Sequence, residues 1–367
     1  MPALNAWTVW WNADRARYGF SEYWHAPIFS PSRYALAFSE AQPTSLIVAL
    51  IVYAAGPAAG YNIYLLAVLT LNGVVTFRLL KRTGLAIVPA LLGGVLVETL
   101  PMVHWQLGVL QLTAICGVVW TIDRLVVLRD APTIANAALL GVAAFLCYAA
   151  CNYFGLFLSV LLPLTFLPLV FGRWLDWRFW LFVAASAVVA GMLSLPILWA
   201  QFEAKREYEW HRDESLIVSL SAQPRDYLTT PWRPRIEGPD FKDPKRPLWM
   251  LGGGPFKLFL ATAGIVAGLC MRGRRRWTLF VILFGAAAFG LSLGPAFEIR
   301  QWSPYKAVMA LHPGLALARS PFRFAFFVQL ATAMLAANAI DGLWKAAFAL
   351  GRRLSRGSKS VSRAATV

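Results

Sequence analysis

The chain has 367 residues, of which 58% are hydrophobic and only 14% are charged, and its mean hydropathy is +0.57. A soluble domain carries roughly 25% charged residues, so this composition excludes an ordinary soluble globular protein. The net charge of +16 would suit a nucleic-acid-binding protein, but the basic residues stand in short clusters between apolar runs. That pattern is typical of membrane-protein loops, and we therefore expect no nucleic-acid partner.

Apolar runs long enough to cross ~30 Å of hydrocarbon recur along the chain. They predict an all-α fold, a polytopic transmembrane helical bundle of about nine spans. The expected spans cover residues 61–80, 85–100, 106–128, 133–151, 153–171, 179–200, 256–271, 277–293 and 322–344.

The segments between the spans complete the domain organisation. Residues 1–60 are expected to form an extracytoplasmic loop, rich in aromatic residues up to residue 42 and carrying an interfacial helix over 43–55 that stops at Gly56-Pro57. Residues 61–200 form the first group of transmembrane helices, and residues 201–255 form a large extracytoplasmic loop. Residues 256–344 form the second group of helices, with an outer loop at 295–321, and residues 345–367 form a basic cytoplasmic tail.

The short connections set the orientation of the spans. Alternate connections carry Arg78, Lys81 and Arg82, then Arg124 and Arg129, then Arg173 and Arg178, then Arg272, Arg274, Arg275 and Arg276, then the basic tail. Loops rich in Lys and Arg face the cytoplasm, so we predict a multi-pass protein of a bacterial inner membrane with a cytoplasmic C-terminus. All four histidines then fall on the outer side. The loop at 201–255 balances nine acidic against nine basic residues, which favours an ordered, functional loop over a lipid-binding polybasic segment.

Several short motifs resemble a family. Asn5-Ala6-Trp7, Trp10-Trp11-Asn12, Phe29-Ser30-Pro31 and Ala37-Phe38-Ser39-Glu40, followed by the helix from Pro43, resemble the first outer loop and juxtamembrane helix of the GT-C glycosyltransferase superfamily. The segments starting at His104, Arg212 and Arg319 resemble segments of uncharacterised members. The resemblance spans nearly the whole chain and implies transfer of a sugar from a polyprenyl-phosphate donor on the extracytoplasmic face.

One departure from the family pattern bears on the active site. Members of the superfamily begin with a cytoplasmic N-terminus and a first span, followed directly by an acidic residue. This chain starts inside the loop, at Met1-Pro2-Ala3-Leu4, so we expect either a true start site upstream of Met1 or a member that has lost the first span and that acid.

Inverting glycosyl transfer needs a carboxylate that takes the proton of the acceptor hydroxyl. Asp14 and Glu40 are our candidates for this catalytic residue, since Glu40 precedes the interfacial helix and Asp14 lies nearer the start. The alternative for each is a solvated loop acid.

The departing phosphate needs cationic partners, and a guanidinium offers two aligned donors. Arg319 and Arg323 flank Pro321 at the outer edge of the last span, and Arg212 and Glu214 lie in the large loop, so all four are substrate-binding candidates. The alternatives are snorkelling arginines and a surface ion cluster. A divalent ion, Mg²⁺ or Mn²⁺, held by carboxylates is a further way to neutralise the phosphate.

Glu98 lies inside an apolar run near its outer end, where an ionisable group is costly and function is the default hypothesis. We therefore add Glu98, with the nearby His104 and Gln106, to the substrate-binding candidates. The alternative is that Glu98 and His104 are already hydrated at the interface.

Two other classes of protein stay open. A transporter or flippase of a lipid-linked or envelope component would show internal repeats and charges deep in its spans, and neither is evident. A truncated, non-catalytic membrane protein is the other alternative. The four cysteines show no metal-ligand spacing; Cys147 and Cys151 share a helix face, as packing residues or as a redox pair.

Overall fold

The computed structural model describes residues 2–38, 40–208, 213–229, 249–312, 314–315 and 318–364, with side chains as far as residue 352. Within these residues every regular element is a helix, which confirms the all-α prediction. The first half of the chain contains α1 (Pro2–Arg17), α2 (Ala35–Phe38), η1 (Pro43–Val48), α3 (Ala49–Arg82), α4 (Ile87–Glu98), α5 (Pro101–Trp105), η2 (Leu110–Thr113), α6 (Cys116–Asp130), α7 (Ile134–Ala150), α8 (Asn152–Thr165), α9 (Leu167–Val170) and η3 (Phe171–Arg173).

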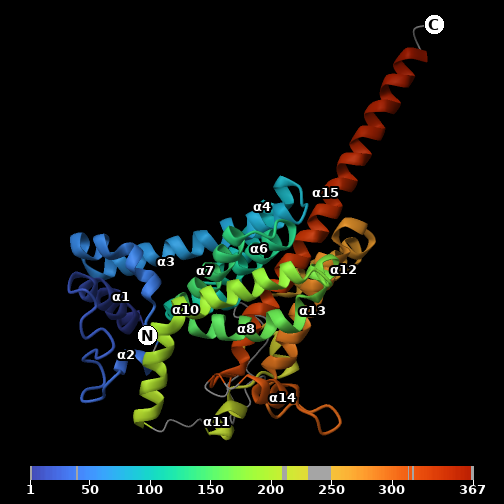
Figure 1. Cartoon of the computed structure of the whole chain (residues 1–367). Helices are drawn as coiled ribbons and strands as arrows, with labels where there is room; N and C mark the ends of the chain where they lie inside the picture. Colours follow the sequence, from blue (N-terminus) through green and yellow to red (C-terminus); the bar gives the residue numbers. More distant parts are fainter. Residues whose placement is uncertain are drawn as a thin grey trace, which may run out of the picture.

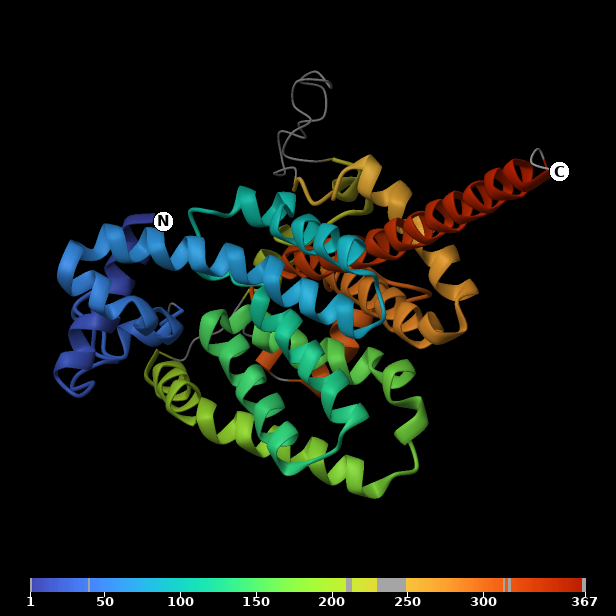
Figure 2. The same cartoon turned by 90° about the horizontal axis from the view of Figure 1, so that it is seen from above.

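The second half continues the helical pattern (Figure 1). It contains α10 (Trp177–Tyr208), α11 (Glu214–Ser219), η4 (Pro224–Leu228), α12 (Pro255–Cys270), η6 (Arg272–Arg274), α13 (Arg275–Ser292), α14 (Pro304–Leu311), η8 (Pro321–Phe324) and α15 (Ala325–Ala364). The far end of α15 projects well beyond the other helices in both views (Figures 1 and 2).

Among the described residues, five helical stretches are long and apolar enough to cross a membrane: Pro43–Arg82, Ile87–Trp105, Trp177–Tyr208, Arg272–Ser292 and Pro321–Arg352. The pair Asn152–Thr165 and Leu167–Arg173, bent by 56°, makes a sixth if it counts as one span. Ile134–Ala150 and Pro255–Cys270 are shorter apolar helices. Each predicted span therefore contains a helix, but the count of nine spans is not confirmed.

The helix expected over residues 106–128 begins later than predicted, at Cys116. A buried asparagine in α3 explains the shift. Asn72 donates through Nδ2 to the carbonyl of Thr113 (2.8 Å) and accepts the Cys116 amide at Oδ1 (2.7 Å). These bonds satisfy backbone groups that a continuous helix would have paired, so the chain reaches α6 through the short turn η2.

The predicted interfacial helix is joined to the first predicted span. The helix α3 runs through Gly56-Pro57, but Gly56 adopts φ 85° and ψ 170°, which kinks the helix there. Gly56 supports this positive φ because it has no Cβ, and Pro57 lacks an amide that would need a partner. The predicted stop is therefore a kink.

The N-terminal region contains a long helix that was expected to be part of a loop. In α1 the buried residues Asn5, Thr8, Val9, Asn12 and Ala13 recur at helical spacing, and α1 packs beside the first half of α3 (Figures 1 and 2). Polar residues interrupt this buried face, so hydropathy did not reveal it.

The core surrounds the first half of α15. Phe324, Phe326 and Phe327 are fully buried, and the ring of Phe324 stacks on Phe157 of α8 at 3.8 Å. A Cβ on Gly264 of α12 would lie 1.8 Å from the Leu335 carbonyl oxygen. Only a glycine lets α12 and α15 approach this closely, as small residues do in membrane helix pairs.

The basic connections predicted to share one side of the membrane lie together in the fold. Arg82 pairs with Asp123 (2.7 Å), Arg173 donates to the Arg129 carbonyl (3.1 Å), and Arg274 pairs with Asp341 of α15 (2.7 Å). The first two contacts join the first three connections, and Arg274 also donates to the Gly84 carbonyl, which joins the fourth connection to them at one end of the bundle. Short elements of the predicted outer loops, α11 and α14, lie together away from the projecting end of α15 (Figure 1).

Candidate functional site

Glu40 is a buried acidic residue with a raised pKa, and contacts from α1 fix the segment that follows it. Asn12 donates through Nδ2 to the carbonyls of Ala41 (2.8 Å) and Gln42 (2.9 Å), and it accepts a hydrogen bond from the Tyr23 hydroxyl at 2.7 Å. Gln42 adopts φ 49°, in the left-handed region. This network sets the direction in which the chain enters η1 and so places Glu40 against the junction of α7 and α8.

The Glu40 carboxyl is buried, with 8% of the residue exposed. The Cys151 thiol donates to Oε1 over 3.7 Å. The backbone amides of Asn152 and Tyr153, in the first turn of α8, also favour the ionised carboxylate and lower its pKa. Oε2 has no hydrogen-bond partner within the described part of the chain. A buried polar atom without a partner is rare in a folded protein and favours a bound water or ligand.

Burial raises the pKa of Glu40 from 4.5 to about 7, because the protein interior solvates a negative charge poorly. The Arg323 charge, the Cys151 thiol and the two α8 amides oppose this effect. The positive end of the α8 dipole also favours the ionised carboxylate. With a pKa of about 7, the carboxyl is partly protonated and partly ionised at neutral pH. It can therefore take up or release a proton at physiological pH.

The positive charge of Arg323 lies near enough to this carboxyl to lower its pKa, although the two groups form no direct ion pair. Its guanidinium carbon lies 4.2 Å from the centroid of the Tyr153 ring, and it interacts electrostatically with Glu40. Arg323 Nε and the hydroxyl of the fully buried Tyr305 have no hydrogen-bond partners among the described residues. The Glu40 carboxyl and the Arg323 guanidinium thus both lie at the start of α8, and Tyr305 interacts electrostatically with Tyr153 there.

Glu98, His104 and Gln106 form a second group at the turn between α4 and α6. The ring Nε2 of His104 hydrogen-bonds to the Glu98 carbonyl oxygen at 2.9 Å. The Glu98 carboxyl is half-buried beside Gly73 of α3, where a Cβ would lie 3.3 Å from Oε2. The backbone amide of Gln106 donates to the carbonyls of Met102 and Val103. Within the described residues, no hydrogen bond or ion pair joins this group to Glu40.

The remaining described candidates form no hydrogen bond or ion pair with Glu40. Asp14 forms an ion pair with its neighbour Arg15 at 2.5 Å on α1. Glu214 pairs with Lys306 at 3.2 Å in an exposed ion pair, and Arg319 is exposed. Arg212 lies outside the described residues. The sequence therefore named the two groups that the fold brings together, Glu40 and Arg323, along with others that it does not.

The sequence singled out Cys151 only together with Cys147 and not as a neighbour of Glu40, and it did not point to Asn152, Tyr153 or Tyr305. A polar Asn-Tyr pair at the short turn between two apolar runs was the available signal for the first three. Tyr305 carried no signal, because its burial depends on how the loop after α13 folds back.

The described surroundings of Glu40 do not suit a divalent ion. No group of three or more His, Cys, Asp or Glu side chains that could hold a metal occurs among the described residues 2–38, 40–208, 213–229, 249–312, 314–315 and 318–352. Glu40 is a single carboxylate among hydrogen-bond donors and a cation, whereas Mg²⁺ and Mn²⁺ prefer several oxygen ligands.

No protein-family model matches the chain, and no curated protein matches it significantly.

Proposed function

We propose that this protein is an integral membrane glycosyltransferase that moves a sugar from a polyprenyl-phosphate donor to an acceptor hydroxyl. The observation that carries the proposal is the buried Glu40 carboxyl, whose pKa is about 7, beside the guanidinium of Arg323. A catalytic base works best when its pKa lies near the working pH. The resemblance to the GT-C superfamily supports the same reaction class.

The proposed step is an inverting displacement. The Glu40 carboxylate takes the proton of the acceptor hydroxyl while that oxygen attacks the anomeric carbon of the donor sugar. The new carbon–oxygen bond forms as the bond to the phosphate breaks. Polyprenyl phosphate leaves with the electron pair, and Arg323 and Tyr305 donate to the charge that develops on it. No step passes through a metal ion.

The proposal also assigns a location. The five or six described helical stretches that are long and apolar enough to span a membrane support a membrane location, and the polyprenyl-phosphate donor would enter from the lipid. The gathering of basic connections at one end supports a cytoplasmic position for that end, by the rule that positive loops stay inside. Glu40 would then act on the extracytoplasmic side of a bacterial inner membrane.

Release of polyprenyl phosphate tests the proposal, since every such donor yields this product. The full-length protein in lipid nanodiscs is supplied with polyprenyl-phosphate-linked glucose, mannose, galactose or arabinose and with acceptor saccharides. We expect release from at least one donor, lowered about 10²-fold or more by Glu40→Gln. Glu298→Gln, an exposed carboxyl in the loop after α13, serves as the matched control.

Equal release by the wild type and Glu40→Gln would contradict the assigned base. Acceptor-independent movement of the intact donor across the bilayer would favour the transporter or flippase alternative. Neither release nor movement with a folded protein would favour the non-catalytic alternative.

A further inference from the structure

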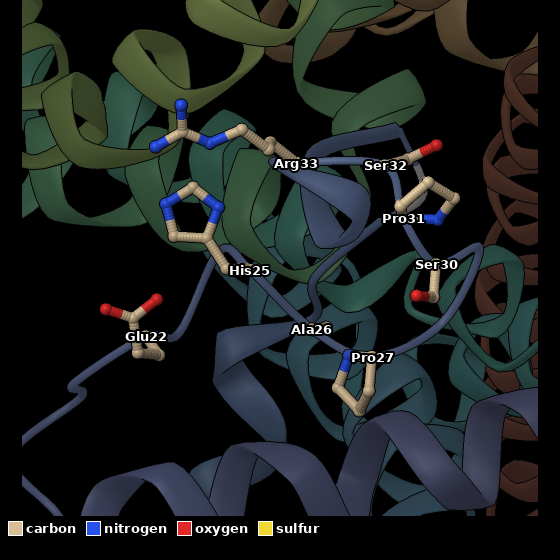
Figure 3. Close-up of a pocket in the computed structure, with 8 residues that line it drawn as sticks. All are labelled: Glu22, His25, Ala26, Pro27, Ser30, Pro31, Ser32 and Arg33. Carbon is tan, nitrogen blue, oxygen red and sulfur yellow. The ribbon is translucent and has the colours of Figure 1, made fainter.

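The loop between α1 and α2 forms an open polar hollow at residues 22–33, with a volume of about 370 Å³ (Figure 3). This volume lies at the lower end of the range for small-molecule pockets. Figure 3 shows the side chains of His25 and Arg33 together on one side and Ser30, Pro31 and Ser32 on another. Glu22 and Pro27 also line the hollow.

Contacts to α1 and α10 hold this loop in place. The Arg33 amide donates to the Tyr208 hydroxyl at 2.8 Å, and the Trp11 indole donates to the Tyr23 carbonyl at 2.9 Å. The Tyr34 ring packs edge-on against Trp199 of α10 at 5.8 Å. The hollow is therefore built on rigid helices, and its shape is largely set before a ligand arrives.

The side chains that line the hollow include both hydrogen-bond donors and hydrogen-bond acceptors. The Tyr34 amide donates to Nδ1 of His25 at 3.2 Å, so a neutral His25 carries its proton on Nε2, where it can donate. Arg33 donates, the Glu22 carboxylate accepts, and the Ser30 and Ser32 hydroxyls do both.

This mixture restricts the class of ligand. A simple anion would meet the Glu22 charge and a simple cation the Arg33 charge, while an apolar molecule would leave the polar groups without partners. A sugar ring has hydroxyls that both donate and accept, and its C–H faces fit the rigid rings of Pro27 and Pro31. A saccharide therefore matches the lining better than the other classes.

We propose that the polar hollow at residues 22–33 binds a saccharide, and that this saccharide is the acceptor of the transfer. The second half of this inference rests on the proposed function. The first half stands on the hollow alone, because saccharide binding can be measured without turnover. The wall residue Ala26 packs in one cluster with Ala41, which follows Glu40, so the hollow and the base belong to one folded segment.

Binding is measured by saturation-transfer NMR on the full-length protein in nanodiscs. The probes are the methyl glycosides of glucose, mannose, galactose and N-acetylglucosamine, the methyl furanoside of arabinose, and inorganic phosphate as competitor. We expect at least one glycoside to bind, and Glu22→Gln and Arg33→Met each to weaken it about tenfold, which is the usual effect of losing one charged hydrogen bond. The matched controls Glu298→Gln and Arg300→Met, exposed after α13, should bind as the wild type does.

Binding of none of the five glycosides to the folded protein would overturn the saccharide assignment. Displacement of a bound glycoside by phosphate, with sensitivity to Arg33→Met alone, would show an anion site and overturn it as well. Glycoside binding that survives in Glu40→Gln, together with lost turnover, supports both proposals. Glycoside binding by a wild type that shows no turnover would retain the site and remove its role as the acceptor site.

Discussion

A carboxyl group that is buried without a full set of partners couples the stability of the fold to pH. Burial raises the pKa of Glu40 from 4.5 to about 7. Between these values the folded protein holds a proton that the unfolded chain has released. The stability contributed by this group is therefore fully present below about pH 4.5 and is lost as the pH rises through about 7.

Glu40→Gln keeps the shape of the side chain and removes its charge, so the variant should lose this pH dependence. We expect the wild type to lose roughly 2–3 kcal/mol of stability between pH 5 and pH 8 through Glu40, and the variant to lose none by this route. Thermal melting followed by tryptophan fluorescence across that range measures the difference. Melting curves that shift in parallel for both proteins would contradict the buried, proton-accepting carboxyl.

At the same scale, the sequence could name Glu40 and Arg323 but not their proximity. Each was chosen from its own surroundings, as an acid before a helix and an arginine at the edge of a span. Their meeting depends on how the chain after α2 packs against the start of α8, through Asn12, Ala41 and Gln42. Such long-range packing leaves no local pattern in the sequence.

At the scale of elements, a buried ion cluster ties α15 to the chain after α12. Asp341 has no exposed surface; it pairs with Arg274 (2.7 Å) and Lys345 (2.9 Å) and accepts the Ala86 amide at 2.7 Å. Removing the carboxylate leaves the Arg274 charge buried without it. Breaking a buried pair from one side costs about 3–5 kcal/mol.

We expect Asp341→Asn to lower the unfolding free energy by about that amount, and Asp130→Asn by less than about 1 kcal/mol. Asp130 is the matched control, because its carboxylate pairs with Arg129 while 56% of its side chain is exposed. Thermal unfolding in one detergent compares the two variants. Equal losses would show that the cluster does not hold α15 in place.

Hydropathy found the helices better than their ends. Each of the nine apolar runs contains a helix, because a long apolar segment in a membrane must pair its own backbone groups. The errors arise where a polar side chain replaces a helical bond, as Asn72 does before α6, or where a helix continues into polar sequence, as α10 does to Tyr208. Only five of the described helical stretches, or six with the bent pair, are long and apolar enough to cross a membrane. The number of spans is therefore a separate question from the number of helices.

At the scale of the whole molecule, the alternation of basic connections predicted that they would share one end, and contacts such as Arg82–Asp123 and Arg274–Asp341 join them there. Which side of the membrane this end faces is a further prediction. Single cysteines test it in a Cys116→Ser, Cys270→Ser background, because Cys116 is half-buried and Cys270 is exposed near the basic end, whereas Cys147 and Cys151 are buried.

We expect a membrane-impermeant maleimide to label Glu298→Cys in intact cells, and Gly273→Cys only after the membrane is opened. Glu298 lies in the predicted outer loop, and Gly273 lies in a basic connection with open space around its Cα. The reverse pattern would invert the orientation and place Glu40 on the cytoplasmic side. Labelling of both in intact cells would show that the two ends do not lie on opposite sides.

The central claim is that Glu40 and Arg323 form one site for a polyprenyl-phosphate donor. Binding of a long-chain polyprenyl phosphate to the purified full-length protein tests it most directly, because the measurement needs neither the donor sugar nor the acceptor. In native mass spectrometry we expect the wild type and Arg300→Met to bind the lipid equally, and Arg323→Met to bind it at least about tenfold more weakly. Equal binding by all three folded proteins would contradict the claim.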